Sequence, residues 1–167
     1  MAYLLDANVF IAAKDLHYGF DFCPAFWDWI VERHAAGVVS SVEKVGGEIA
    51  AGADELAAWA ETLPEEFFLS PTPSIAASLA AVSNWVSSGR YDPAAVSTFL
   101  QVADYYLVAQ ALESDDVVVT HERPSPTVRR IKIPDVCLGL GIKFMTPSRC
   151  CEESGLGLSF RRHEIHQ

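Results

Sequence analysis

The segment Val117-Val118-Val119-Thr120 restricts the fold of this chain more than any other part of its sequence. Three β-branched residues in succession favour a strand, and a strand that is apolar at every position needs cover on both faces. A second short apolar run, Ala2-Tyr3-Leu4-Leu5, ends at Asp6 in the same way. Between these runs the apolar residues follow helical spacing. Buried strands that alternate with helices predict an α/β fold, with three α/β/α layers around a central, mainly parallel sheet.

The remaining elements are predicted from periodicity and from the residues that start or stop helices. Ser40 or Ser41 could cap a helix that runs to about Ala51, and the helical stretch 93–113 could be two helices that meet near Val102. No repeat or linker divides the chain, so residues 1–150 are predicted to form one domain and residues 151–167 a loose C-terminal tail. We expect further strands at 38–39, 67–69, 130–133 and 143–145, and further helices at 23–37, 54–63, 74–86 and 135–140.

The charge of the chain limits the classes of function. Twenty-two acidic residues against 12 basic ones give a formal net charge of −10, which argues against a simple basic nucleic-acid-binding module. The basic residues are not evenly spread, however, because four of them follow Glu122 closely. These are Arg123, Arg129, Arg130 and Lys132.

Neither the N-terminus nor the cysteines indicate export. The first residues lack the basic region of a signal peptide, and no apolar run approaches the roughly 18 residues of a membrane span, so a cytoplasmic protein is expected. The cysteines show neither CxxC pairs nor histidines at zinc-finger spacing, which predicts reduced structural thiols. They are Cys23, Cys137, Cys150 and Cys151, and the tail residues His163 and His166 are expected at the surface.

Two acids lie at the ends of predicted strands. Asp6 follows the first strand, and Glu122 comes two residues after Thr120. In parallel α/β sheets, ligands and chemistry gather outside the carboxyl ends of the strands. Asp6 and Glu122 are therefore candidates for a functional site, although Asp6 could equally serve only to cap the following helix.

Two more acids lie on helices and are directed towards the interior. Asp104 falls within an apolar helical stripe that includes Leu107 and Ala111, where a carboxylate is costly unless it is paired, hydrogen-bonded or bound to a metal. Glu48 lies at the edge of the inner face of its helix, whereas Glu43 points nearly the opposite way. Gly46 and Gly47 lower helix propensity there, but they allow another group to approach the backbone closely. Asp104 could still be a buried structural residue.

Four acids brought together would repel one another, and some of their pKa values would rise until a cation bound. Mg²⁺ and Mn²⁺ prefer oxygen ligands and usually keep several waters beside one or two carboxylates. A divalent ion held in this way can activate water and stabilise the charge on a phosphodiester during its hydrolysis. The sequence therefore predicts a site for Mg²⁺ or Mn²⁺ made of Asp6, Glu48, Asp104 and Glu122.

These residues, in this order, resemble the motifs of the PIN-domain nucleases. The resemblance rests on Asp6-Ala7-Asn8 after the first strand, Glu48 on an early helix, Asp104 on a later one, and Thr120-His121-Glu122 after a strand, and it covers residues 3–148. Within that family the chain looks like one bacterial subfamily that resembles the VapC-type toxins of type II toxin–antitoxin pairs. The subfamily resemblance rests on Tyr3–Ile11, Phe26-Trp27-Asp28-Trp29, Lys44-Val45 and Ile133–Cys137.

The resemblance implies a metal-dependent endoribonuclease in which Asp6, Glu48, Asp104 and Glu122 are catalytic metal ligands. Asn8 would orient Asp6, Thr120 would support the site, and Glu122, where the family usually has Asp, would reach the metal through water. An antitoxin protein could cover the site, with the aromatic side chains of Phe20–Trp29 in that interface or in the core, and a homodimer is possible. The candidates for substrate contact are Lys14, Lys44, His121 and Asp135, of which Asp135 could instead cap a helix.

Two other classes of protein compete with this interpretation. A phosphatase of the haloacid-dehalogenase kind also has an Asp after its first strand, but it needs a second Asp two residues later as acid and base. Asn8 occupies that position and cannot transfer the proton. A catalytically weak PIN-like module that binds RNA or a protein would fit the acidic charge and the departure at Glu122.

Overall fold

The computed structural model describes residues 1–17, 19–20 and 24–155, and within them five strands form one sheet. The strand order is β3-β2-β1-β4-β5, and every neighbouring pair is parallel. The predicted α/β fold with a parallel sheet is thereby confirmed. The strands are β1 (Tyr3–Leu5), β2 (Val39–Val42), β3 (Phe68–Leu69), β4 (Val117–Val119) and β5 (Phe144–Met145).

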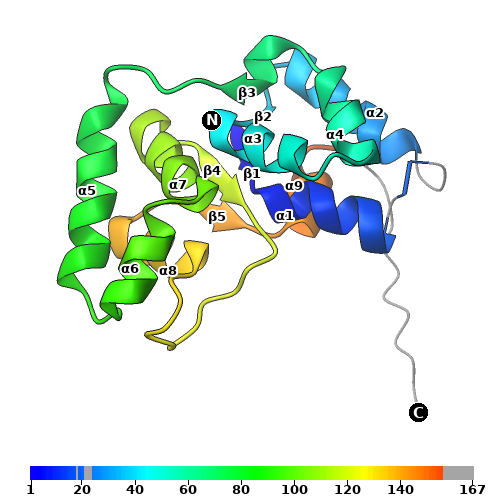
Figure 1. Ribbon diagram of the computed structural model, residues 1–167. Coiled ribbons are helices and arrows are strands. Elements are labelled where there is room, and N and C mark those ends of the chain that lie inside the picture. The colour runs from blue at the N-terminus through cyan, green and yellow to red at the C-terminus, as the bar shows by residue number, and fades with distance from the viewer. Residues whose placement is uncertain (18, 21–23, 156–167) are drawn as a thin grey trace.

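Helices cover both faces of the sheet, which completes the three layers. Figure 1 shows α5, α6, α7 and α8 to the left of the sheet, and α1, α2, α4 and α9 to its right. Helix α3 follows β2 directly and packs against both α4 and α7. The helices of the described residues are α1 (Ala7–Ala12), α2 (Pro24–Ala35), α3 (Glu43–Ala51), α4 (Glu55–Glu61), α5 (Ile75–Ser88), α6 (Pro93–Phe99), α7 (Ala103–Ser114), α8 (Ile133–Leu140) and α9 (Pro147–Glu153), with a π-helical turn at Ala13–His17 and a 3₁₀ turn at Glu65–Phe67.

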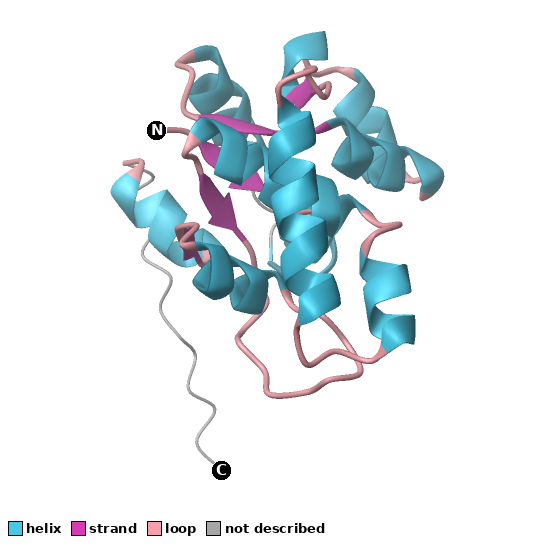
Figure 2. Ribbon diagram, turned by 90° about the vertical axis from the view of Figure 1, so that its left-hand side faces the viewer, coloured by secondary structure: helices cyan, strands magenta, loops and turns pink. Residues whose placement is uncertain are grey.

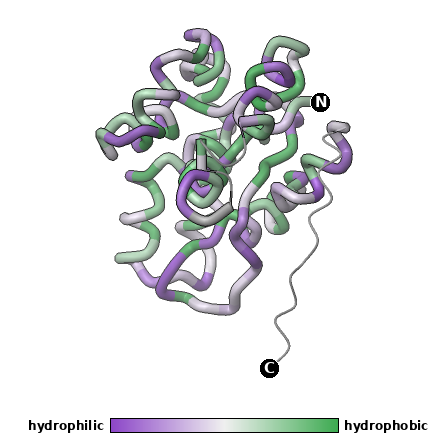
Figure 3. Tube along the Cα trace, turned by 90° about the vertical axis from the view of Figure 1, so that its right-hand side faces the viewer, coloured by the Kyte–Doolittle hydropathy of each residue, from purple (hydrophilic) through white to green (hydrophobic). Residues whose placement is uncertain are grey.

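The core lies where the two helical layers meet the sheet. Val118, Val119 and Leu4 have no exposed surface, as the uniformly apolar strands predicted. Figure 3 shows the hydrophobic residues concentrated at the centre and the hydrophilic ones on the outer loops. Phe26, Trp27 and Trp29 of α2 are also buried, so these aromatic side chains belong to the core. Burial of this apolar surface is the main favourable contribution to folding.

The direction of the strands decides where functional side chains gather. Because all five strands are parallel, their carboxyl ends lie at one edge of the sheet. Helices α7 and α8 each lead directly into the next strand, β4 or β5, and therefore begin at that same edge. Residues just after a strand and residues in the first turn of α7 or α8 are consequently neighbours in space. Asp6, Asp104 and Glu122 all satisfy this condition.

Two local predictions need correction, and a third is confirmed. Ser41 does not cap a helix, because β2 extends to Val42 and the Ser41 hydroxyl donates a buried hydrogen bond of 2.6 Å to the Leu5 carbonyl. Residues 130–133 do not form a strand. Ile131 and Ile133 are buried as the alternation required, but β5 already occupies the place beside β4, and Ile133 begins α8. The break near Val102 is confirmed, since Val102 is the N-cap residue of α7.

The C-terminal region continues the domain beyond residue 150. Helix α9 crosses this predicted boundary, and Cys150 and Cys151 on it are buried and free, as is Cys137. Residues 156–167 lie outside the described residues, including His163 and His166, as does Cys23. Among the helices that are described, none is both long and apolar enough to cross a membrane.

Candidate functional site

Asp6 lies directly after β1, at the carboxyl edge of the sheet, and only 2% of its surface is exposed. Its carboxylate accepts a hydrogen bond of 2.9 Å from the Thr120 hydroxyl, which follows the neighbouring strand β4. The pKa of Asp6 is raised to about 6, mainly by burial and also by the charge of Glu122, while the Thr120 hydroxyl and the nearby backbone N–H groups of Asn8 and Ala7 oppose the change. The charged form of Asp6 is therefore disfavoured by burial, although its carboxylate is held by the Thr120 hydroxyl.

Asp104 lies in the first turn of α7 and faces the same edge. Burial is the main reason that its pKa is raised to about 7. The negative charges of Asp6, Glu122 and Glu48, in decreasing order, contribute to this rise, and the Arg130 guanidinium opposes it. No hydrogen bond to the Asp104 carboxylate is found in the described part of the chain. Asp104 is therefore a half-buried acid, repelled by three others and without a donor of its own.

Glu48 and Glu122 each bind the first backbone N–H of a helix. Glu48 reaches from α3 to accept a hydrogen bond of 3.1 Å from Ala103 N, at the start of α7. Glu122 accepts one of 2.9 Å from Ile133 N, at the start of α8. Carboxylates stabilise helix N-termini because the N–H groups there have no partner within the helix. Both glutamates thus have a structural role, and the second oxygen of Glu122 lies 3.7 Å from Arg130 Nη2.

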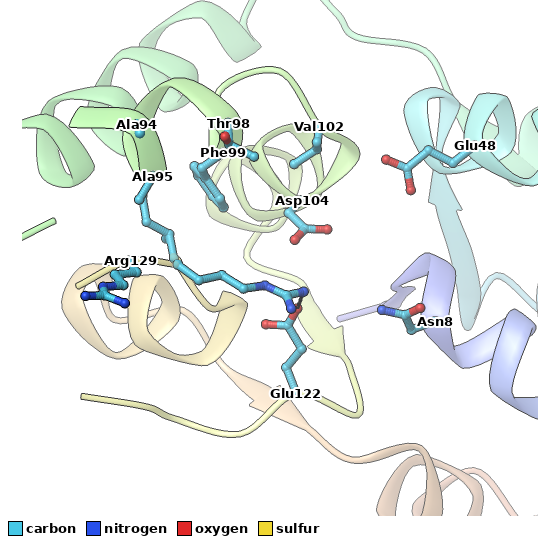
Figure 4. A pocket seen from close by; sticks show the side chains of 12 residues that line it. Asn8, Glu48, Ala94, Ala95, Thr98, Phe99, Val102, Asp104, Glu122 and Arg129 are labelled. Atoms are coloured by element: carbon cyan, nitrogen blue, oxygen red, sulfur yellow. Dashed lines mark ion pairs between the residues drawn. The ribbon is translucent and has the colours of Figure 1, made fainter. Parts of the chain in front are cut away.

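The acids border a cavity of about 510 Å³. Figure 4 shows Asp104 between Glu48 on one side and Glu122 on the other, with the Asn8 amide nearby. Asp6 is buried beneath this surface. The other walls come from α6 and from the loop that joins β4 to α8. The cavity is lined by Asn8, Glu48, Ala94, Ala95, Thr98, Phe99, Val102, Asp104, Glu122, Arg129, Arg130 and Ile131.

Comparison with known proteins places the chain in a family. A family model described as "Domain of unknown function (DUF4411)" matches residues 3–157. The chain belongs to the DUF4411 family. All four acids of the DUF4411 site and both cavity walls lie within the matched segment. No curated protein and no solved structure matches the chain.

The donor chemistry of the DUF4411 site suits Mg²⁺ or Mn²⁺, because the converging side chains offer only oxygen atoms. Asp104, with its raised pKa and its lack of a hydrogen-bond donor, would gain from a nearby cation. The positions are less favourable: among the described residues, no three His, Cys, Asp or Glu side chains are grouped so that they could hold one metal ion. Glu48 and Glu122 are instead directed to helix N-termini. Of the other two acids, Asp104 lines the cavity and Asp6 is buried.

Of the two residues predicted to support the site, Thr120 contacts Asp6 directly. Thr120 is buried and both donates to Asp6 and accepts a hydrogen bond from Glu122 N, so it joins two of the acids. Asp6 is the N-cap residue of α1 but makes no side-chain capping hydrogen bond there, and the Asn8 side chain lines the cavity. In the DUF4411 domain the Asp6 carboxylate is thus oriented by the hydroxyl of Thr120.

The four candidates for substrate contact lie outside the lining of this cavity. Lys14 Nζ is 2.6 Å from Asp54 and 3.0 Å from Asp15, and Lys44 Nζ lies 5.1 Å from the centre of the Tyr106 ring. Asp135 lines a separate cavity and accepts a hydrogen bond from Ser125 N. His121 is exposed, between Thr120 and Glu122.

Sequence reasoning did not anticipate the wall that α6 contributes. Ala94, Ala95 and Thr98 line the cavity, but small residues on a helix resemble any other helix surface in the sequence. Arg129 and Arg130 differ from the α6 residues in this respect. Their cluster after Glu122 is evident from the sequence, but their position in the cavity is not.

Proposed function

We propose that this protein is a PIN-like, metal-dependent endoribonuclease that hydrolyses the phosphodiester bonds of RNA. The observation that carries the proposal is the environment of Asp104. Its carboxylate faces a cavity, accepts no hydrogen bond within the described residues, and is repelled by acids from three other elements. An arrangement of this kind is costly for a fold and useful for binding a cation.

A bound Mg²⁺ or Mn²⁺ would lower the pKa of a water molecule and stabilise negative charge on the phosphate. Asp6 and Asp104 would hold the ion, and Glu48 and Glu122 would act through bound water. Thr120 keeps the Asp6 carboxylate in one orientation. Hydrolysis forms a bond between the water oxygen and phosphorus, breaks a P–O bond, and transfers a proton to the departing oxygen. Arg129 and Arg130 supply positive charge at the same cavity.

A second candidate function is a PIN-like module that binds RNA or a protein without cleavage. The hydrogen bonds that Glu48 and Glu122 make to α7 and α8 favour it, because they give both glutamates a reason to be present without any metal. They do not explain Asp104, which has no such partner in the described region. For this reason we place the nuclease first.

The cellular setting of the proposed activity rests on the resemblance to PIN-domain toxins. We propose that the protein is a cytoplasmic toxin and that an antitoxin partner covers the acidic cavity, with a basic side chain directed at the carboxylates. We also propose that the toxin forms a homodimer. The aromatic residues of α2 are buried and are therefore poor candidates for the partner surface. Expression of the chain alone should arrest growth, and expression of Asp104→Asn should not.

The decisive experiment is a cleavage assay on single-stranded and structured RNA, with single-stranded DNA of the same sequence alongside. The wild type should cut RNA with Mn²⁺ or Mg²⁺ and stop when EDTA is added. Asp104→Asn should lose at least about 100-fold in rate, since it removes a metal ligand.

Helix α3 provides a matched pair of variants for the same assay. Glu48→Gln should reduce cleavage strongly, whereas Glu43→Gln changes an exposed acid on the same helix that does not line the cavity, and should cut as the wild type does. Equal activity in the wild type and Asp104→Asn would indicate a contaminating nuclease. Absence of cleavage, together with absence of Mn²⁺ binding by calorimetry, would favour the binding module.

A further inference from the structure

The cavity has walls of opposite charge. Asp104 and Glu48 form one side, and the loop of residues 120–132 brings Arg129 and Arg130 to the other, where Glu122 of the same loop is paired with Arg130. Figure 2 shows this segment as a long loop without helix or strand between β4 and α8. Because acidic residues outnumber basic ones in this chain of net charge −10, two adjacent arginines beside a cluster of acids are unexpected and indicate a function.

The loop is fixed at several points, so the arginines keep a defined place. Ser125 N donates to Asp135 Oδ2 at 3.1 Å, and the Ser125 carbonyl accepts from Arg90 at 3.1 Å. Asp92 N donates to the Val128 carbonyl at 3.0 Å, just before the arginines. Asp135 thus acts on the site indirectly, by holding the loop. This accounts for Asp135, whose role the sequence left open.

The two guanidinium groups have their donors free for a ligand. Arg130 is 64% exposed, and its Nη2 lies 3.7 Å from Glu122 Oε1, beyond hydrogen-bond distance. No side-chain hydrogen bond is found for Arg129 or Arg130 within the described residues. Although Glu122 is buried, the Arg130 end of this long ion pair is open to solvent, so its planar guanidinium can offer two N–H groups to a phosphate.

We propose that Arg130 binds the phosphate that is cleaved and that Arg129 binds an adjacent phosphate of the same RNA strand. This inference rests on the proposed nuclease function. Arg130 is paired with Glu122 and lowers the pKa of Asp104, which places its charge beside the acids. Arg129 is turned away from Asp104 and Glu122 (Figure 4). The acidic wall then holds the cation, and the basic wall holds the RNA backbone.

The two arginines should differ in kinetics. Arg130→Ala should lower kcat about 100-fold, because it removes charge stabilisation at the reacting phosphate. Arg129→Ala should raise KM several-fold with kcat nearly unchanged, as expected for a contact made equally before and during the reaction. Arg130→Lys should restore only part of the rate, since lysine keeps the charge but loses the two-pronged geometry. Arg149→Ala, on α9 and paired with Glu153, serves as the control.

Binding of fluorescein-labelled single-stranded RNA in EDTA, measured by anisotropy at several salt concentrations, separates the two proposals. Each arginine variant should weaken binding and reduce the salt slope by about 1, while Arg149→Ala should not. RNA cleavage by the wild type with unchanged binding and kinetics in both arginine variants would overturn this inference and leave the nuclease. Salt-dependent binding that both arginines support, without any cleavage, would overturn the nuclease alone. Absence of RNA binding by the wild type would overturn the role of the arginines.

Discussion

At the scale of single residues, Asp104 carries the unusual energetics of this molecule. Its pKa is raised from 3.8 to about 7 in the folded chain, and that of Asp6 to about 6. A carboxyl whose pKa is higher in the folded state than in the unfolded state binds its proton more tightly when folded. Its contribution to stability is therefore present below about pH 4 and is lost as pH rises through the folded pKa.

Asp104→Asn should remove the fall in the free energy of unfolding that ionisation of Asp104 causes as pH rises. In EDTA, the free energy of unfolding of the wild type should fall relative to that of the variant between pH 4 and pH 8, by an amount on the order of 1–3 kcal/mol after allowance for partial exposure. The measurement is urea unfolding of both proteins across this range, with Glu43→Gln as control. Parallel pH profiles for the wild type and Asp104→Asn would show that the carboxyl of Asp104 is not perturbed.

At the scale of elements, the position of α3 depends on two neighbouring glycines with opposite surroundings. A Cβ atom on Gly46 would lie 2.9 Å from Cγ of Phe68 on β3, whereas a Cβ on Gly47 would meet nothing within 4 Å. The close approach that the sequence predicted at this pair is thus real at Gly46 only. It allows α3 to lie directly on the Phe68 ring, at a distance that lets Glu48 reach the start of α7.

Alanine substitutions at the two glycines should act in opposite directions. Gly47→Ala should stabilise the protein by about 0.5–1 kcal/mol, through the higher helix propensity of alanine. Gly46→Ala gains the same propensity but must displace the Phe68 ring, and a net loss of about 1–2 kcal/mol is expected because overpacking a core is costly. Denaturant unfolding midpoints measure both changes. Stabilisation by both substitutions would mean that the ring moves aside freely.

At the scale of the whole molecule, the site joins parts of the chain that are far apart in sequence. Asp6 follows β1, Asp104 lies in the first turn of α7 and Glu122 lies in the loop before α8, and their mutual repulsion acts against the packed arrangement. A cation that binds only the folded protein would stabilise the whole molecule through this one edge of the sheet.

Millimolar Mn²⁺ should therefore raise the Tm of the wild type by roughly 3–10 °C at pH 7.5, as estimated for a ligand well above its Kd. Asp104→Asn should lose most of this rise, and Glu43→Gln should keep it. Because a chain of net charge −10 is also stabilised by general screening, NaCl of equal ionic strength is the necessary comparison. A rise of the same size in NaCl would argue against a specific ion site.

Some of the site could be predicted because the relevant signals are local. The apolar runs before Asp6 and Thr120 indicate strands buried on both faces, and the break at Val102 places Asp104 in a first helical turn. Predictions from local patterns were wrong where the structure of a segment depends on residues far away in the sequence. Residues 130–133 alternate like a strand, but the place beside β4 is taken by β5. Ser41 looks like a helix cap, but its hydroxyl binds the Leu5 carbonyl.

The sequence alone determined the alternation of strands and helices, the parallel sheet that follows from it, and the identity of the four acids, because periodicity and strand ends are properties of short segments. Only the tertiary structure decided how those acids differ. Packing removed Asp6 from water, left Asp104 without a donor in the described region, and turned Glu48 and Glu122 towards helix N-termini. It also brought Arg129 and Arg130, rather than Lys14 or Lys44, to the cavity. These differences depend on the distances between elements, and those distances are set by how the helices pack across the sheet. A short segment of sequence does not specify them.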